Sequence, residues 1–126
     1  MNQMPQPIYI HNLSKPLNTP ARVGYCDSFL CRLRGLMFRP HLDPNDGLLL
    51  VEKRNSRIDT SIHMLFVRFD LAVFWINSEM IVVDKVIAKS WKPVYISKQD
   101  AQYTLEIHPS RWGDYEIGDK VEFKNA

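Results

Sequence analysis

The side chains best suited to chemistry lie in or near one apolar stretch of the sequence, residues 62–69. His63 could transfer a proton or orient a ligand near neutral pH, although a core histidine satisfied by backbone hydrogen bonds is the commoner case and the one we favour. Arg68 also has apolar neighbours, where an unpaired charge would be costly, so it needs a carboxylate partner or an anionic ligand. Asp70 and Glu106 are plausible partners, and we favour a structural ion pair.

The spacing of these residues limits which of them can share a site. In a regular strand His63 and Arg68 would point to opposite faces, so both could line one pocket only across a β-bulge. Arg34 stands at the expected end of a helix, where a cation either complements the helix dipole or binds a ligand. The residues that we expect to bind a ligand are Arg34, His63, Arg68, Asp70 and Glu106. No catalytic role is assigned to them at this point.

Motifs of several well-known chemistries are absent from the sequence. It contains no Walker loop, no G-x-G-x-x-G, no H-E-x-x-H and no G-x-S-x-G, so nucleotide hydrolysis, dinucleotide redox chemistry, zincin proteolysis and serine-esterase chemistry lose their usual support. Cys26 and Cys31 are expected to be free thiols, because no export signal is evident. Their spacing is not completed by a histidine pair, so we expect neither a metal site nor a cofactor.

Composition indicates one globular domain. The chain has 126 residues, of which 45% are hydrophobic, and its net charge is +2. No apolar run reaches the roughly 18 residues that span a bilayer, and the first residues lack the features of a signal peptide, so we expect a soluble, cytoplasmic protein without a membrane partner. The 16 basic and 14 acidic side chains are interspersed, which argues against a dedicated nucleic-acid domain.

The N-terminal part is predicted to differ from the rest of the chain. Residues 1–20 hold four prolines, each of which fixes φ and lacks an N–H donor. We therefore expect an arm or edge strand over residues 1–20, with a short strand at residues 8–10, that could dock on a protein partner or on a second copy. Residues 21–126 are expected to form the single main domain.

A single short helix and several strands are predicted to follow. Ser28 is an N-cap type, Phe29, Leu30 and Leu33 follow at helical spacing, and Gly35 suits a helix end, so a helix is expected at 28–35. Strands are expected at 22–25, 48–51, 62–69, 71–76, 80–91, 102–108 and 121–123. This pattern predicts a mostly β protein, a compact antiparallel β-barrel or sandwich.

Side-chain alternation adds three expectations about exposure. In 102–108, Tyr103, Leu105 and Ile107 should face one side of the strand, and Thr104, Glu106 and His108 the other. Trp75 has apolar neighbours and is expected in the core. Trp91 and Trp112 have polar neighbours and are expected to be half exposed, where they could close a barrel end or stack on a sugar or a base.

Several of these segments, taken in order, resemble the uncharacterised family called domain of unknown function 192. The matching pieces are R-G-L-M-F-R at 34–39, D-G-L-L at 46–49, I-H-M-L-F-V-R-F at 62–69, W-K-P at 91–93, L-E-I at 105–107 and G-D at 118–119. The resemblance covers roughly residues 20–123 and implies a compact, mostly β fold with one short helix and no established activity. The family usually has proline and aspartate where this chain has Asp70 and Ala72, so Asp70 could replace the missing aspartate.

Three functions remain open from the sequence. The first is a non-enzymatic module that binds a small anionic or polyhydroxylated ligand in an arginine-containing cleft, or that binds a protein. The second is a hydrolase or lyase in which His63 works with Asp70 or Glu106 as acid and base. The third is weak single-stranded nucleic-acid binding through Trp91, Trp112 and the basic cluster at 53–57.

Overall fold

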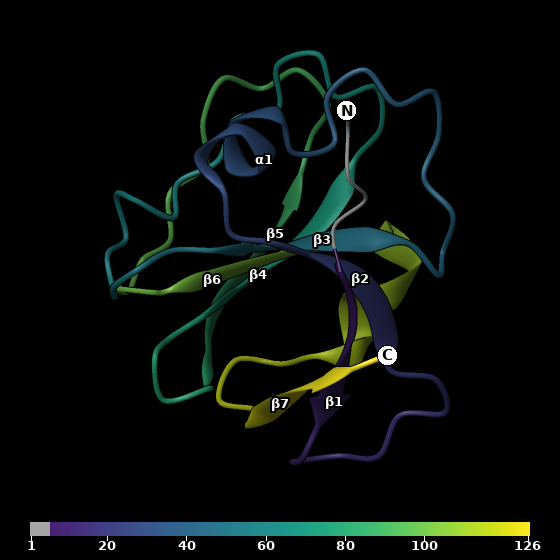
Figure 1. The fold of residues 1–126 in the computed structure, drawn as a ribbon, viewed down its shortest axis with the longest axis vertical. Helices are drawn as coiled ribbons and strands as arrows, with labels where there is room; N and C mark the ends of the chain where they lie inside the picture. The colour runs from purple at the N-terminus through teal and green to yellow at the C-terminus, as the bar shows by residue number, and fades with distance from the viewer. Residues whose placement is uncertain (1–5) are drawn as a thin grey trace.

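The computed structural model describes residues 6–126, which form one seven-stranded sheet curled into a half-barrel (Figure 1). The elements are β1 (Gln6–Asn12), β2 (Ala21–Cys26), α1 (Phe29–Arg34), β3 (Gly47–Val51), β4 (Leu71–Ile76), β5 (Val82–Ala88), β6 (Tyr103–Ile107), the 3-10 helix η1 (Pro109–Asp114) and β7 (Val121–Asn125). The mostly β fold class is therefore confirmed. No helix among residues 6–126 is long and apolar enough to cross a membrane.

The strand order is β5-β4-β6-β3-β2-β1-β7. All neighbouring pairs are antiparallel except β2 and β3, which are parallel, so the sheet is mixed where an antiparallel one was expected. β1 lies between β2 and β7, which corrects the expectation of an arm or edge strand for residues 6–12. Pro7 pairs with Gly24 of β2 and precedes the first residue of β1 that pairs with β7, and residues 1–5 lie outside the described part of the chain.

Both faces of the sheet are covered, and a separate hydrophobic core lies on each. The inner face of the half-barrel carries alternate residues such as Leu105 and Ile107, as predicted. The outer face carries Leu48, Val73 and Trp75, which pack beneath α1 and the segment between β3 and β4. The central strands β3 and β4 are therefore buried on both faces, which is why their sequences are continuous apolar runs without alternation.

The strand predicted over residues 62–69 does not form. This segment makes a single isolated bridge, between Ile62 and Tyr95, and then turns at Phe66, whose φ is +62°. Its apolar residues pack as part of a loop: Ile62, Met64 and Val67 are buried on the outer face of the sheet. The inference that His63 and Arg68 point to opposite faces of a strand therefore loses its premise.

The predicted helix is confirmed, but its apolar side chains are not in a core. The side chain of Ser28 accepts a hydrogen bond from the Cys31 N–H at 3.1 Å, and Gly35, with φ of +50°, ends the helix. Phe29 and Leu30 are 69% and 74% exposed. Helical spacing therefore predicted the correct element, and the apolar side chains at that spacing are exposed.

Cys26 and Cys31 form a disulfide, so the prediction of free thiols is wrong. The chain bends at Ser28 on entering α1, and the two Cα atoms lie 5.6 Å apart, within the range that a disulfide requires. Sequence spacing could not show this bend. The bond fastens the end of β2 to the middle of α1.

Loss of this disulfide is expected to lower the free energy of unfolding by about 2 kcal/mol, a small value because the closed loop is short. The double variant Cys26→Ala, Cys31→Ala should show this loss in urea denaturation. Adding a reductant should destabilise the unmodified protein by a similar amount and leave the double variant unchanged. Identical unfolding of the unmodified protein with and without reductant would contradict the prediction.

Candidate functional site

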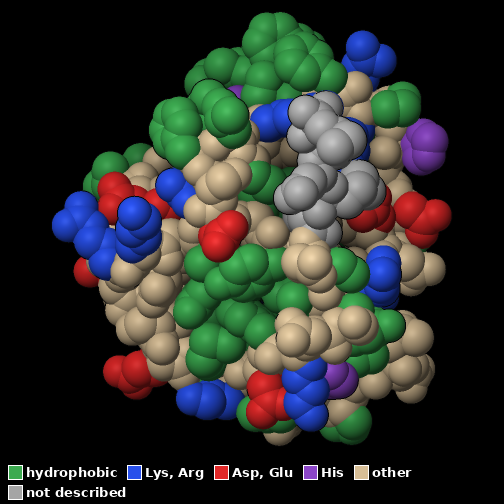
Figure 2. Space-filling model, in the orientation of Figure 1, with side chains coloured by type: hydrophobic (Ala, Val, Ile, Leu, Met, Phe, Trp, Pro, Cys, Tyr) green, Lys and Arg blue, Asp and Glu red, His purple; other side chains and the backbone are tan. Residues whose placement is uncertain are grey.

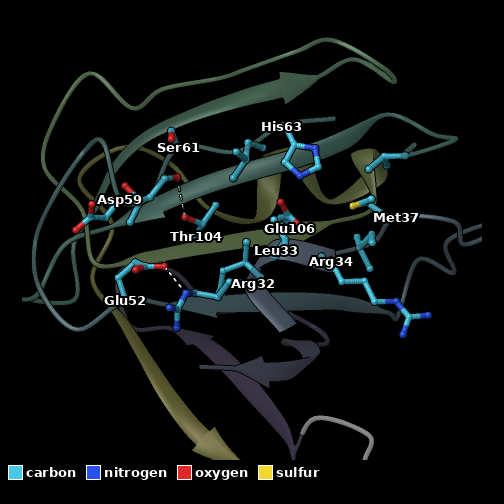
Figure 3. Close-up of a pocket in the computed structure, with 16 residues that line it drawn as sticks. Arg32, Leu33, Arg34, Met37, Glu52, Asp59, Ser61, His63, Thr104 and Glu106 are labelled. Atoms are coloured by element: carbon cyan, nitrogen blue, oxygen red, sulfur yellow. Dashed lines mark hydrogen bonds and ion pairs between the residues drawn. The ribbon is translucent and has the colours of Figure 1, made fainter. Parts of the chain in front are cut away.

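A cavity of about 70 Å³ lies between the outer face of the sheet, α1 and the segment that precedes β4 (Figure 3). β6 provides Thr104 and Glu106 on the cavity side of the sheet, as their alternation predicted. α1 and the residues that follow it form a second wall, and the segment 59–63 forms a third. Three stretches far apart in the sequence therefore meet around one polar cavity.

Glu106 is the acidic side chain at the base of the cavity. It belongs to β6, which lies between β3 and β4, and it is only 4% exposed. Its carboxyl group makes no hydrogen bond or ion pair with another described residue. Burial without a compensating charge raises the pKa of Glu106 to about 7. Near neutral pH this group can therefore donate a hydrogen bond in its protonated form or accept one as a carboxylate.

His63 faces Glu106 across the cavity (Figure 3). Its Nδ1 atom is buried and has no hydrogen-bond partner among residues 6–126. The expectation of a core histidine satisfied by the backbone therefore fails for this nitrogen. A buried polar atom without a partner costs free energy, so the pair of His63 and Glu106 is a place where a hydrogen-bonding ligand would be favoured.

Arginine contributes to the walls of the cavity and not to its base. Arg34 lines the cavity from the last turn of α1, but its guanidinium group points away from His63 and Glu106 (Figure 3). Arg32 Nε forms an ion pair with Glu52 Oε2 at 2.7 Å. Burial raises the pKa of Glu52, while Arg32 opposes that rise. The arginine whose charge could reach an entering ligand is thus Arg34, at the rim.

The structure separates the remaining predicted site residues, Arg68 and Asp70, from this cavity. Arg68 is exposed and makes no ion pair with a described residue, so the predicted structural ion pair is absent. Asp70 accepts a hydrogen bond from the Ser90 N–H at 2.9 Å, and this bond lowers the pKa of Asp70. Ala72, where the family usually has aspartate, is buried in the inner core and does not line the cavity.

Several cavity residues were missed by the sequence analysis. Ser61 and Thr104 bring hydroxyl groups to the walls, and each hydroxyl donates to a backbone carbonyl, of Ile58 and Thr60 respectively. Gly35 lies next to the base, where an added Cβ would stand 3.7 Å from Glu106 Oε1. Of these residues, only Thr104 could have been found from the sequence, because strand alternation places it on the same face as Glu106.

Beside the cavity stand three exposed aromatic residues that contact one another, Phe38, Phe66 and Trp91, named here the aromatic cluster. The ring centroids of Phe38 and Phe66 are 5.2 Å apart, and those of Phe66 and Trp91 are 5.0 Å apart. All three residues have positive φ, between 62° and 68°. The half-exposed state predicted for Trp91 is confirmed, as it is for Trp112, whose ring lies 3.9 Å from Lys85 Nζ.

Glycine at position 38 is expected to be more stable than alanine there, by about 1 kcal/mol, because a Cβ is unfavourable at a φ of +66°. Leu33 in α1 provides the comparison, since alanine should be better than glycine by about 1 kcal/mol inside a helix. Urea denaturation of Phe38→Gly, Phe38→Ala, Leu33→Gly and Leu33→Ala tests both orders. If alanine were the better residue at both positions, the strain assigned to Phe38 would be wrong.

The fold defines a class: a single mixed sheet curled into a half-barrel, with one short helix and a polar cavity on its outer face. The chain belongs to the family called domain of unknown function 192, described as "Uncharacterized ACR", whose model matches residues 11–123. The resemblance seen in the sequence is thereby confirmed.

Relatives in this family carry no assigned activity in their names. A UPF0127 protein of Pyrococcus furiosus is 36% identical over 114 residues, covering 89% of this chain and 95% of the relative. One of Pyrococcus horikoshii is 34% identical over 122 residues, covering 90% of this chain and 97% of the relative. One of Thermococcus kodakarensis is 40% identical over 85 residues, and there the match covers 68% of this chain and only 52% of the relative.

Two solved structures share the fold. A proposed transcription regulator from Sinorhizobium meliloti 1021 has a TM-score of 0.82 and 19% identity, with 98% of this chain and 97% of that one covered. A protein of unknown function from Novosphingobium aromaticivorans has a TM-score of 0.75 and 19% identity, with 92% of this chain and 83% of that one covered. At this identity the likeness shows the fold alone.

Proposed function

We propose that this protein binds a small polyhydroxylated ligand, one of whose hydroxyl groups enters the cavity between His63 and Glu106. The supporting observation is that the Nδ1 atom of His63, which is buried without a hydrogen-bond partner among residues 6–126, and the carboxyl of Glu106, a residue only 4% exposed, line one cavity. A hydroxyl group can donate to one of them and accept from the other. The cavity is small, so it would hold one part of the ligand, with the remainder above the rim.

The charge of the cavity favours a hydroxylated ligand over an anionic one. Glu106 lies at the base, and an anion there would meet the carboxylate once that group ionises. Arg34, the cation that could oppose this repulsion, points away from the base. Anion binding would therefore need a protonated Glu106, whereas a polyol can bind to either form.

Ligand-induced thermal stabilisation tests the proposal. Glycerol, myo-inositol and glucose would be titrated against the protein at pH 6, with phosphate and citrate as anionic comparators. A bound ligand at ten times its Kd stabilises the folded state by about 1.4 kcal/mol, so a saturable rise in Tm is expected with a polyol. His63→Phe and Glu106→Leu, which remove the polar atoms that face the cavity, should abolish the saturable rise, and Asp70→Asn, outside the cavity, should retain it.

The variants are needed because polyols also stabilise proteins by exclusion from their surface. That effect does not saturate and would be equal in all variants. A polyol response unchanged by His63→Phe and Glu106→Leu would overturn the proposal. So would stabilisation by the anions alone, because the ligand class would then be wrong.

Acid–base catalysis on such a ligand is a second candidate function. The observation that favours it is that a carboxyl whose pKa is about 7 faces an unpartnered histidine nitrogen, an arrangement suited to proton transfer near neutral pH. Asp70, the other carboxylate considered from the sequence, is outside the cavity. Methyl glycosides incubated with the protein and followed by proton NMR would test hydrolysis or elimination. Equal rates for the unmodified protein and Glu106→Gln would exclude a role for Glu106.

Nucleic-acid binding and a cytoplasmic location stay predictions. Lys85 Nζ lies over the ring of Trp112, and Arg54 in the basic cluster pairs with Asp59 at 3.1 Å, so fewer groups of the predicted surface are free to contact a nucleic acid. The disulfide is typical of oxidising compartments, which bears against the cytoplasmic expectation.

A further inference from the structure

α1 and the loops around it lie at one end of the molecule (Figure 1), and this end exposes a concentration of large apolar side chains (Figure 2). Phe29, Leu30 and Leu33 project from α1 with exposed fractions of 69%, 74% and 53%. The aromatic cluster of Phe38, Phe66 and Trp91 adds three further side chains, each between 44% and 57% exposed. Both groups adjoin the same cavity, because Leu33 lines it and so do the chain neighbours of Phe38 and Phe66. We call these six residues the apolar rim.

The three aromatic residues of the rim have a backbone conformation, positive φ, that residues with a Cβ rarely adopt. The N–H of Phe38 donates to the carbonyl of Phe66 at 2.9 Å, and the N–H of Trp91 donates to the carbonyl of Met64 at 2.9 Å. Phe38, Phe66 and Trp91 each adopt a positive φ in the segments that these bonds join. Positive φ in residues with a Cβ persists where the surroundings impose it, and such positions gather at binding surfaces.

Unpaired cations accompany the apolar rim. Arg34 follows Leu33, Lys92 follows Trp91, and Arg68 is two residues after Phe66. All three are exposed, and none forms an ion pair with a residue of the described chain. Asp70, the neighbouring acid, is already engaged by Lys89 at 3.3 Å. The rim therefore combines apolar side chains with net positive charge.

We propose that the apolar rim docks on an anionic lipid surface. Leu, Phe and Trp side chains beside Lys and Arg form the pattern of proteins that lie on membranes without crossing them. Tryptophan prefers the interface between lipid and water, and anionic headgroups attract nearby cations. This departs from the expectation of no membrane partner, which rested on the absence of a spanning segment. The proposal is independent of the polyol site.

Vesicle co-sedimentation provides the test. The full chain is mixed with vesicles of phosphatidylcholine alone and with vesicles in which about a third of the lipid is phosphatidylserine. Binding is expected to the anionic vesicles and to weaken with added salt. The emission of Trp91 should shift to shorter wavelength on binding, a shift that Trp91→Phe removes and Trp112→Phe retains.

Matched variants separate the rim from the rest of the surface. Leu30→Ser is expected to weaken binding about tenfold, whereas Leu13→Ser, also at an exposed leucine but outside the rim, should not change it. Arg68→Glu should weaken binding about fivefold or more, whereas Arg22→Glu, on the exposed side of β2, should have little effect. Circular dichroism confirms that each variant is folded.

Three results would overturn the proposal. The first is no binding to the anionic vesicles, and the second is binding that the rim variants and the control variants reduce equally. The third comes from sedimentation velocity without lipid: a dimer that Leu30→Ser dissociates and Leu13→Ser does not would show that a second copy covers the rim.

Discussion

Glu106→Gln is expected to stabilise the protein by about 3 kcal/mol at pH 8 and to leave its stability almost unchanged at pH 4. The pKa of the Glu106 carboxyl rises from its ordinary value of 4.5 to about 7 because burial disfavours the charged form. A pKa difference of this size means that ionising Glu106 costs about 3 kcal/mol more in the folded protein than in the unfolded chain. Glutamine has the shape of the protonated acid and never ionises, so it avoids the cost.

The direction of the pH dependence follows from which state binds the proton more tightly. Between pH 4.5 and 7 the folded protein holds a proton on Glu106 that the unfolded chain has released, so stability falls as the pH rises through this window. Below it both states are protonated, and above it both are ionised. Urea denaturation at pH 4, 6 and 8 measures the free energy of unfolding of the unmodified protein and of Glu106→Gln, and so the difference between them at each pH. Parallel pH profiles for the unmodified protein and Glu106→Gln would contradict the raised pKa.

The same group connects stability with the proposed function. A buried, unpartnered carboxyl is tolerated only if something offsets its cost, and a hydroxyl donor from a ligand would do so. We therefore expect a bound polyol to lower the pKa of Glu106, because the hydroxyl group can donate to the ionised form. Carbon-13 NMR titration of the Glu106 carboxyl, with and without the ligand, measures this change directly.

Gly47→Ala is expected to destabilise the fold by about 3 kcal/mol, because the start of β3 has no space for a side chain there. A Cβ at this position would lie 2.8 Å from Ile107 Cγ2 and 3.2 Å from Val23 Cγ1, and it would overlap the carbonyl oxygen of Glu106. Because that oxygen belongs to the backbone of the neighbouring strand, it cannot move aside without disturbing the pairing of β3 with β6.

Gly113→Ala is the control for this prediction, since nothing lies within 4 Å of the Cβ that it would add. It should change the free energy of unfolding by no more than about 0.5 kcal/mol. Unfolding in urea, followed for both variants, gives the comparison. Similar stability of Gly47→Ala and Gly113→Ala would show that β3 and β6 can separate at this point.

The local sequence predicted those features that depend on neighbouring residues. The N-cap at Ser28, the helix end at Gly35 and the alternation around Glu106 each arise from interactions within a few positions of the chain, and each is confirmed. The strand at 71–76 was found with its observed bounds, because a run of branched and aromatic residues buried on both faces has few other conformations.

The errors arose where partners distant in the sequence decide the conformation. Residues 62–69 have the composition of a strand, yet their apolar side chains pack onto the outer face of the sheet as a loop, through a bridge to Tyr95. The disulfide between Cys26 and Cys31 is a local exception, because it depends on the bend at Ser28, which brings their Cα atoms to 5.6 Å and which residue spacing does not show. The burial of β1 between β2 and β7 requires the C-terminal strand, more than 100 residues later in the chain, to pair with it.

The sequence by itself therefore determined the family, the mostly β class and the short list of polar residues from which a site could be built. Only the tertiary structure decided which of those residues meet: it placed His63 opposite Glu106 and left Arg68 and Asp70 outside. The physical reason is that a strand's alternation fixes which face a side chain occupies but not what covers that face. The cover over Glu106 consists of α1 and the segment before β4, and its position depends on packing across the whole sheet.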